Sequence, residues 1–129
     1  MAQFSKISEE RLLTCHPDIV AVCRELIKQM DVSVLCGRRT KAEQEAAYKA
    51  GRSFAQYPQS AHNRLPSHAI DLAPYPIDWD NLARFKEMWL RFDAIARVLK
   101  ARGDIRSDFV WGGDFKRLKD CPHIEIKEE

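Results

Sequence analysis

Long hydrophobic runs, glycine, proline and an excess of either charge are all scarce in this sequence. No apolar run approaches the roughly 20 residues that a membrane-spanning helix needs, so we expect no stable insertion into a membrane. With 5 Gly and 6 Pro, the chain is neither a low-complexity linker nor a collagen-like repeat. Lys and Arg number 21 against 19 Asp and Glu, and this net charge of only +2 gives no support to nucleic-acid binding.

We also expect no secretory signal, because residues 1–7 hold no apolar stretch that ends in a cleavage site. We therefore expect the chain to be made in the cytoplasm. The rest of the composition is that of a globular protein, with 129 residues of which 45% are hydrophobic and 31% charged. This length fits one domain over residues 1–129.

The spacing of the four cysteines argues against a thiolate zinc site. None lies in a Cys-x-x-Cys pair, which excludes zinc-ribbon and thioredoxin-like interpretations. Cys15, Cys23 and Cys36 lie in helix-like or strand-like runs, and we expect them to be buried free thiols. Only Cys121 lies beside residues that could carry chemistry.

Helical and strand-like segments alternate along the chain. Apolar spacing, capping residues and glycine stops predict helices over residues 17–30, 40–51 and 80–102. Alternating or β-branched runs predict strands over 32–36, 69–73, 108–111 and 123–127. Residues 52–68 follow neither period, and ordered connections of this length are often functional. Helices interleaved with short strands around one small sheet indicate the α+β class.

His62, Asp71 and His123 are the candidate metal ligands. Alternation along residues 69–73 turns Asp71 away from the core, and alternation along 123–127 does the same for His123 and its neighbour Glu125. If the two strands are neighbours, these side chains meet on one face of the sheet, and the long loop brings His62 across. Two imidazoles and one carboxylate are a typical catalytic zinc set. Taken singly, each histidine is more often a surface or capping residue than a ligand.

Asp120 and Arg39 are candidates for a role in catalysis. Asp120 stands three residues before His123, from where it could reach the water on a metal ion as a general base. A turn aspartate before proline is an equally good interpretation of the spacing. Arg39 stands between a strand and a helix, where it could hold a substrate carboxylate or an oxyanion, or form a solvated basic corner.

Other histidines and one thiol compete for these roles. His68 lies just before a predicted strand and could replace His62 as a ligand. Cys121 could bind zinc together with His123, although a loop thiol is the simpler interpretation. His16 precedes a helical proline and is expected to be a cap or surface residue.

Three motifs together resemble the M15 family of zinc peptidases. They are Ser60-Ala-His62, the run Ser67-His-Ala-Ile-Asp71-Leu-Ala-Pro-Tyr75, and Asp120-x-x-His123-x-Glu125. The family includes D-alanyl-D-alanine carboxypeptidases and dipeptidases, and small phage endolysins that are L-alanyl-D-glutamate endopeptidases. The resemblance covers about residues 30–127.

The resemblance implies that His62, Asp71 and His123 bind Zn²⁺, that Asp120 is the general base and that Arg39 clamps or polarises the substrate. It further implies that Ser60 and Glu125 support these groups or contact the substrate. The implied fold is a small antiparallel sheet flanked by helices, of the Hedgehog/DD-peptidase type. Two features depart from the pattern: His62 and Asp71 stand two positions further apart than is common, and Pro66-Ser67 replaces a frequent glycine.

The resemblance implies a zinc-dependent peptidase that cuts peptidoglycan stem peptides, namely a phage or prophage endolysin with L-alanyl-D-glutamate endopeptidase activity. A D-alanyl-D-alanine carboxypeptidase or dipeptidase is the alternative enzyme, and a non-catalytic zinc-binding module of the same fold is the alternative outside catalysis. We expect a monomer in the cytoplasm of a host bacterium that reaches the cell wall through a separate release system.

Overall fold

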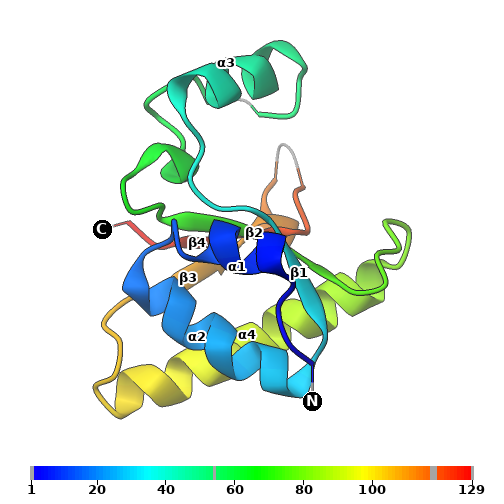
Figure 1. The fold of residues 1–129 in the computed structure, drawn as a ribbon, viewed down its shortest axis with the longest axis vertical. Coiled ribbons are helices and arrows are strands. Elements are labelled where there is room, and N and C mark those ends of the chain that lie inside the picture. The colour runs from blue at the N-terminus through cyan, green and yellow to red at the C-terminus, as the bar shows by residue number, and fades with distance from the viewer. Residues whose placement is uncertain (1, 54, 117–118, 129) are drawn as a thin grey trace.

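The computed structural model describes residues 2–53, 55–116 and 119–128, and helices and strands alternate along them (Figure 1). The helices in this part of the chain are α1 (Lys6–Leu12), α2 (Pro17–Gln29), α3 (Lys41–Lys49) and α4 (Leu82–Ala101), with short 3-10 turns η1 (Ala61–Asn63) and η2 (Gly112–Asp114). The strands are β1 (Val32–Cys36), β2 (Ala69–Pro74), β3 (Phe109–Trp111) and β4 (His123–Ile126). In the described residues, no helix has the length and apolar character needed to cross a bilayer.

The strands form one sheet in the order β1-β2-β4-β3, and every neighbouring pair is antiparallel. The predicted α+β class and the small antiparallel sheet are therefore confirmed. β2 and β4 are the two central strands, although they are far apart in the sequence. Their register sets Asp71 opposite His123 and Ile70 opposite Ile124.

The hydrophobic core lies between the sheet and the helix pair α2 and α4, which cover one face of the sheet (Figure 1). Ile70, Leu72 and Ile124 point into this core from the strands and are fully buried. Phe85 and Phe92 meet them from α4. Side chains at alternate strand positions therefore point to the opposite face, on which the turn η1 contacts β2.

Local signals account for the ends of the long helices. Pro17 opens α2 at a position where its missing N–H costs nothing, and the His16 ring caps this helix by accepting the Asp18 N–H. Thr40 and Glu43 form the predicted capping box of α3. Gly51, with a φ of +75°, follows the end of α3 in the left-handed region that favours glycine.

The short helix α1 is an element that apolar periodicity does not predict, because 7 residues span only two turns. Ser5 caps it, and it packs along the outer edge of β1. Ser8 accepts the Val34 N–H at 2.9 Å, while Arg11 donates to the Val34 carbonyl at 3.0 Å. These bonds occupy backbone groups of an edge strand that would otherwise be open to another chain.

Gly112 allows the loop before β4 to return against the end of β3. A Cβ atom on this residue would lie 2.1 Å from the Asp120 carbonyl oxygen and 2.9 Å from the Cβ of His123. The Asp120 N–H donates to the Gly112 carbonyl at 2.9 Å across the same contact. The absence of a side chain at position 112 therefore places both Asp120 and His123.

We expect Gly112→Ala to lower the free energy of unfolding by about 1–3 kcal/mol and to displace His123, since the added methyl group overlaps backbone that cannot move freely. Chemical denaturation and the imidazole NMR signals of His123 measure the two effects. Gly103→Ala is the control for the His123 signals. A Cβ there meets nothing within 4 Å, and the only strain comes from its φ of +83°. Unchanged His123 signals in Gly112→Ala would contradict this account.

Candidate active site

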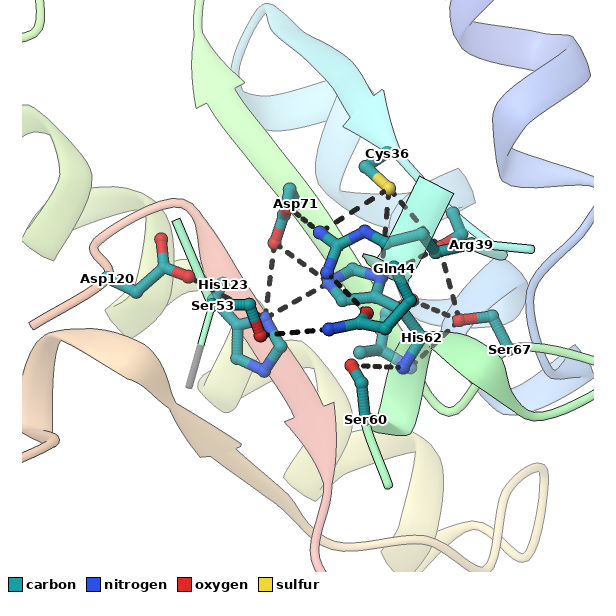
Figure 2. A network of polar contacts seen from close by, with 12 residues as sticks. Cys36, Arg39, Gln44, Ser53, Ser60, His62, Ser67, Asp71, Asp120 and His123 are labelled. Atoms are coloured by element: carbon teal, nitrogen blue, oxygen red, sulfur yellow. Dashed lines mark hydrogen bonds and ion pairs between the residues drawn. The ribbon is translucent and has the colours of Figure 1, made fainter. Parts of the chain in front are cut away.

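The candidate site lies on the face of the sheet opposite α2 and α4. Asp71 from the middle of β2 and His123 from the start of β4 are direct partners in the antiparallel register. His123 Nδ1 lies 3.2 Å from Asp71 Oδ1. Figure 2 shows both side chains pointing toward His62, Arg39 and Cys36. The pairing of β2 with β4 thus brings Asp71 and His123 together, as the alternation of the strand residues predicted.

His62 reaches this face from the 3-10 turn η1, and its side chain is 2% exposed. Ser60 caps the turn, and its hydroxyl accepts the His62 N–H at 3.2 Å. The His62 carbonyl accepts the Arg39 N–H at 2.7 Å, which ties η1 to the turn before α3. These hydrogen bonds to the backbone N–H and carbonyl of His62 therefore hold its ring in the site.

Three donor atoms converge to form a nearly equilateral triangle. His62 Nε2 lies 3.3 Å from Asp71 Oδ1 and 3.2 Å from His123 Nδ1. The third edge, between His123 Nδ1 and Asp71 Oδ1, is also 3.2 Å. These two nitrogens and one oxygen are thus close enough to bind a single metal ion together.

The other nitrogen of each imidazole ring has a hydrogen-bond acceptor. His62 Nδ1 lies 2.7 Å from the Gly37 carbonyl oxygen, and His123 Nε2 lies 2.7 Å from Glu125 Oε1. Since a carbonyl or a carboxylate only accepts, these two nitrogens carry hydrogen. Their partners turn His62 Nε2 and His123 Nδ1 toward the centre of the site, as expected for metal-binding histidines.

Asp71 is the negative charge around which the other groups are arranged. Burial favours its neutral form, but its hydrogen bonds to His123 and His62 outweigh burial and hold its pKa well below its usual range. Burial likewise opposes protonation of the two rings. The bonds to Asp71 and Cys36 nevertheless raise the pKa of His62 to about 10, and those to Asp71 and Glu125 raise that of His123 to about 9. Without a metal ion, Asp71 is therefore the anionic centre of the site, and each neighbouring ring holds a proton more tightly than a free histidine does.

Cys36 also belongs to this site, and the expectation that it is a buried thiol was wrong. A bulge in β1 between Val34 and Cys36 shifts the register, so that Cys36 instead of Leu35 lies opposite Asp71. Its Sγ lies 3.9 Å from His62 Nδ1 and its side chain is only partly buried. Strand alternation cannot reveal this placement, because a bulge reverses the side on which later residues point. Cys15 and Cys23 are buried free thiols, as expected.

Asp120 lies at the edge of the cluster, with Oδ2 4.0 Å from His123 Nδ1. Burial and the neighbouring charge of Asp71 raise its pKa. In the described residues, the donor atoms that could hold a metal fall into two groups that share Asp71, namely Cys36-His62-Asp71 and Asp71-Asp120-His123. Asp120 is thus placed to ligate or to exchange a proton next to the same centre.

Arg39 lies on the other side of Asp71. Its Nη2 is 3.8 Å from Asp71 Oδ2, the oxygen that faces away from the histidines. Its Nη1 donates to Gln44 Oε1 at 2.8 Å. Sequence reasoning missed Gln44, because a single polar residue within a helix has no pattern that marks it as buried.

These groups open into a cleft of about 460 Å³. Its lining includes His62, Asp120 and His123 from the cluster, and Arg39 and Glu125 beside it. Arg52 and Lys116 add positive charge along the walls. A substrate in this cleft would therefore contact two of the candidate metal ligands, His62 and His123, and several cations at once.

The competing candidates have other partners. His68 Nδ1 lies 2.9 Å from Glu128 Oε1, and its ring packs edge-on against His16. Cys121 is in neither donor group, and its carbonyl accepts the Trp111 indole N–H at 2.8 Å. The structure therefore brings His62 into the cluster and leaves His68 and Cys121 outside it.

Comparison with known proteins gives matches over nearly the whole chain. Residues 1–127 match the family model described as phage L-alanyl-D-glutamate peptidase. The peptidoglycan L-alanyl-D-glutamate endopeptidase CwlK of Bacillus subtilis (strain 168) is 33% identical over an alignment 114 residues long, and the match covers 77% of this chain and 62% of CwlK. The chain thus spans less than two thirds of the length of that relative. The crystal structure of the Serratia marcescens L-Ala D-Glu endopeptidase ChiX superposes with a TM-score of 0.78 at 29% identity, covering 97% of this chain and 90% of ChiX.

We expect the metal-free protein to lose stability as the pH rises above 6.5. The folded state raises the pKa of His62 and His123 above the ordinary value of 6.5, so their contribution is complete below that pH. It is lost as the pH rises toward about 9 and 10, at roughly 1 kcal/mol per pH unit for each of the two histidines. Urea unfolding of chelator-treated protein between pH 6.5 and 8.5 measures this slope. His123→Gln should flatten it, and an equal slope in that variant would refute the assignment.

Proposed function

The chain belongs to the phage L-alanyl-D-glutamate peptidase family, and on this basis we propose that it is a zinc-dependent peptidase of peptidoglycan stem peptides. The bond that we propose it cuts is the one between L-alanine and D-glutamate. CwlK and ChiX are named as endopeptidases for this linkage, and the family profile spans residues 1–127. A phage or prophage endolysin is the biological role that these relationships favour.

The triangle of donor atoms is the observation that carries the zinc assignment. Zn–N and Zn–O bonds are about 2.0–2.1 Å long, so two ligands of a tetrahedral ion lie roughly 3.3–3.4 Å apart. The three edges between His62, Asp71 and His123 measure 3.2–3.3 Å. One more tetrahedral position is left toward the cleft, which is the arrangement of a catalytic zinc site with three protein ligands.

The surroundings of the ligands also suit zinc. Glu125 accepts from the far nitrogen of His123, and the Gly37 carbonyl does the same for His62. Such partners select the ring nitrogen that binds the metal and raise its basicity. We therefore assign Glu125 to the orientation of His123, and Ser60 to the orientation of the turn that carries His62. One chain supplies every donor atom, which supports a monomeric enzyme.

Asp120 is the general base of the proposed reaction. When bound, zinc would supply Lewis acidity that lowers the pKa of water and polarises the scissile carbonyl. The carboxylate of Asp120 takes a proton from the attacking water and delivers it to the leaving amine. Its raised pKa suits both steps, because a carboxyl group that is too acidic would not hold the proton between them.

Arg39 stabilises negative charge on the substrate oxygen. Its guanidinium lines the cleft and lies on the side of Asp71 away from the histidines. Arg52 and Lys116 extend the positive charge along the cleft, and they suit the free carboxylate that D-glutamate carries next to the scissile bond.

Substitutions should separate metal binding from proton transfer. We expect His123→Ala and Asp71→Ala to lose both bound zinc and activity, since each removes one of three ligands. Asp120→Asn should keep about one zinc per chain and lose a factor of about 10²–10⁴ in kcat. Metal analysis and lysis of outer-membrane-stripped cells measure the two properties. His68→Ala is the matched histidine control and should change neither.

The scissile bond is tested by mass spectrometry of purified muropeptides digested with and without a chelator. An endopeptidase should release stem peptides that begin with D-glutamate, whereas a carboxypeptidase would release only D-alanine. Chelation should stop the release, and zinc should restore it. Cleavage that survives complete chelation would overturn the zinc mechanism, and zinc binding without any cleavage would point to a non-catalytic module.

A further inference from the structure

Gln44 is a completely buried polar side chain on α3, with an exposed fraction of 0%. Glutamine is seldom buried, and each polar atom of a buried amide must find a partner. Gln44 Oε1 accepts from Arg39 Nη1 at 2.8 Å and from Asn63 Nδ2 at 3.3 Å. Its Nε2 donates to Ser53 Oγ at 3.0 Å and to the Ala55 carbonyl at 2.7 Å. All four hydrogen-bonding positions of the amide are therefore used inside the protein.

These partners belong to three separate segments that form the cleft. Arg39 precedes α3, Asn63 follows His62 in the turn η1, and Ser53 begins the long connection that borders the cleft. Figure 2 shows Gln44 between Arg39 and Ser53. Because the amide is rigid and planar, it holds its partners at fixed relative positions.

The hydrogen bond from Arg39 to Gln44 fixes the position of the guanidinium. Nη1 is bound to Gln44, while Nη2 lies 3.8 Å from Asp71 Oδ2 and 4.0 Å from Cys36 Sγ. A free arginine side chain would lose considerable rotamer entropy on ordering. With Gln44 in place, part of this ordering exists before substrate enters the cleft.

We propose that Gln44 is a positioning residue for the reaction: its amide holds the Arg39 guanidinium in the site and anchors the cleft wall at Ser53 and Ala55. This proposal rests on the proposed peptidase function for its kinetic consequences. Gln44 itself does not contact the substrate. Gln44 affects turnover by positioning Arg39, and it affects substrate binding by positioning the cleft wall.

Two substitutions at position 44 separate these effects. Gln44→Glu keeps an acceptor for Arg39 but sets an oxygen against the Ala55 carbonyl, so it should raise KM about tenfold while kcat changes less than about threefold. Gln44→Met removes the bond to Arg39 as well, and kcat should then fall by a further factor of about ten. Gln56→Glu makes the same chemical change on an exposed residue of the same connection and should leave both constants unchanged.

A double-mutant cycle tests whether Gln44 acts through Arg39. In an Arg39→Ala background, Gln44→Met should no longer lower kcat, because the group that it positions is gone. An equal loss of kcat in both backgrounds would show a general structural role and overturn the proposal. Zinc content should stay at the wild-type level in all of these variants.

Hydrogen exchange gives a readout that does not depend on peptidase activity. Gln44→Glu should accelerate exchange of the Ser53 and Ala55 amides at least about tenfold, whereas Gln56→Glu should not. Unchanged exchange in Gln44→Glu would overturn the anchoring of the cleft wall. If the wild-type protein cleaves no muropeptide, the proposed function fails, but this exchange measurement still decides the positioning by Gln44.

Discussion

The largely buried carboxylate of Asp71, with 17% of its side chain exposed, is the constraint on which the site depends. A charged group in the middle of a central strand is costly to remove from water unless it is paired. Asp71 is paired on every side, since Oδ1 faces His62 and His123 while Oδ2 faces Arg39. Removal of any one partner would leave part of this charge unsatisfied, so the strands, the turn η1 and the segment before α3 are tied to one another through it.

The same arrangement explains why the site is preorganised. The rings that flank Asp71 have their outer nitrogens held by Gly37 and Glu125, so neither can rotate without breaking a second hydrogen bond. Close backbone approaches support this geometry. A side chain on Gly37 would collide with Thr14 and the Arg11 carbonyl, as one on Gly112 would collide with Asp120. Of the three proposed metal ligands, Asp71 and His123 lie on the rigid sheet and His62 lies in η1, whereas the proposed base Asp120 lies in the loop before β4.

Much of the fold follows from patterns that act over a few residues. The alternation around Asp71 and around His123 predicts which face each strand side chain occupies, and the structure has this orientation. The Thr40 cap and the glycine stop of α3 are likewise local, and they mark the helix within one or two residues. The helix α1 escaped prediction because it is too short for a period to show, and it is stabilised by contacts with β1.

Local sequence patterns therefore predict the class of fold, the faces of the strands and a short set of polar residues that could act together. Contacts between distant segments established which other residues join Asp71 and His123. The bulge in β1 brought Cys36 opposite Asp71, and closure of the 52–68 connection placed His62 in the cluster while His68 paired with Glu128. Such contacts also bury Gln44 among three segments. The difference lies in the sequence separation of the interacting residues. Alternation and capping depend on adjacent residues, whereas register shifts and loop closure depend on contacts between segments that are distant in the chain.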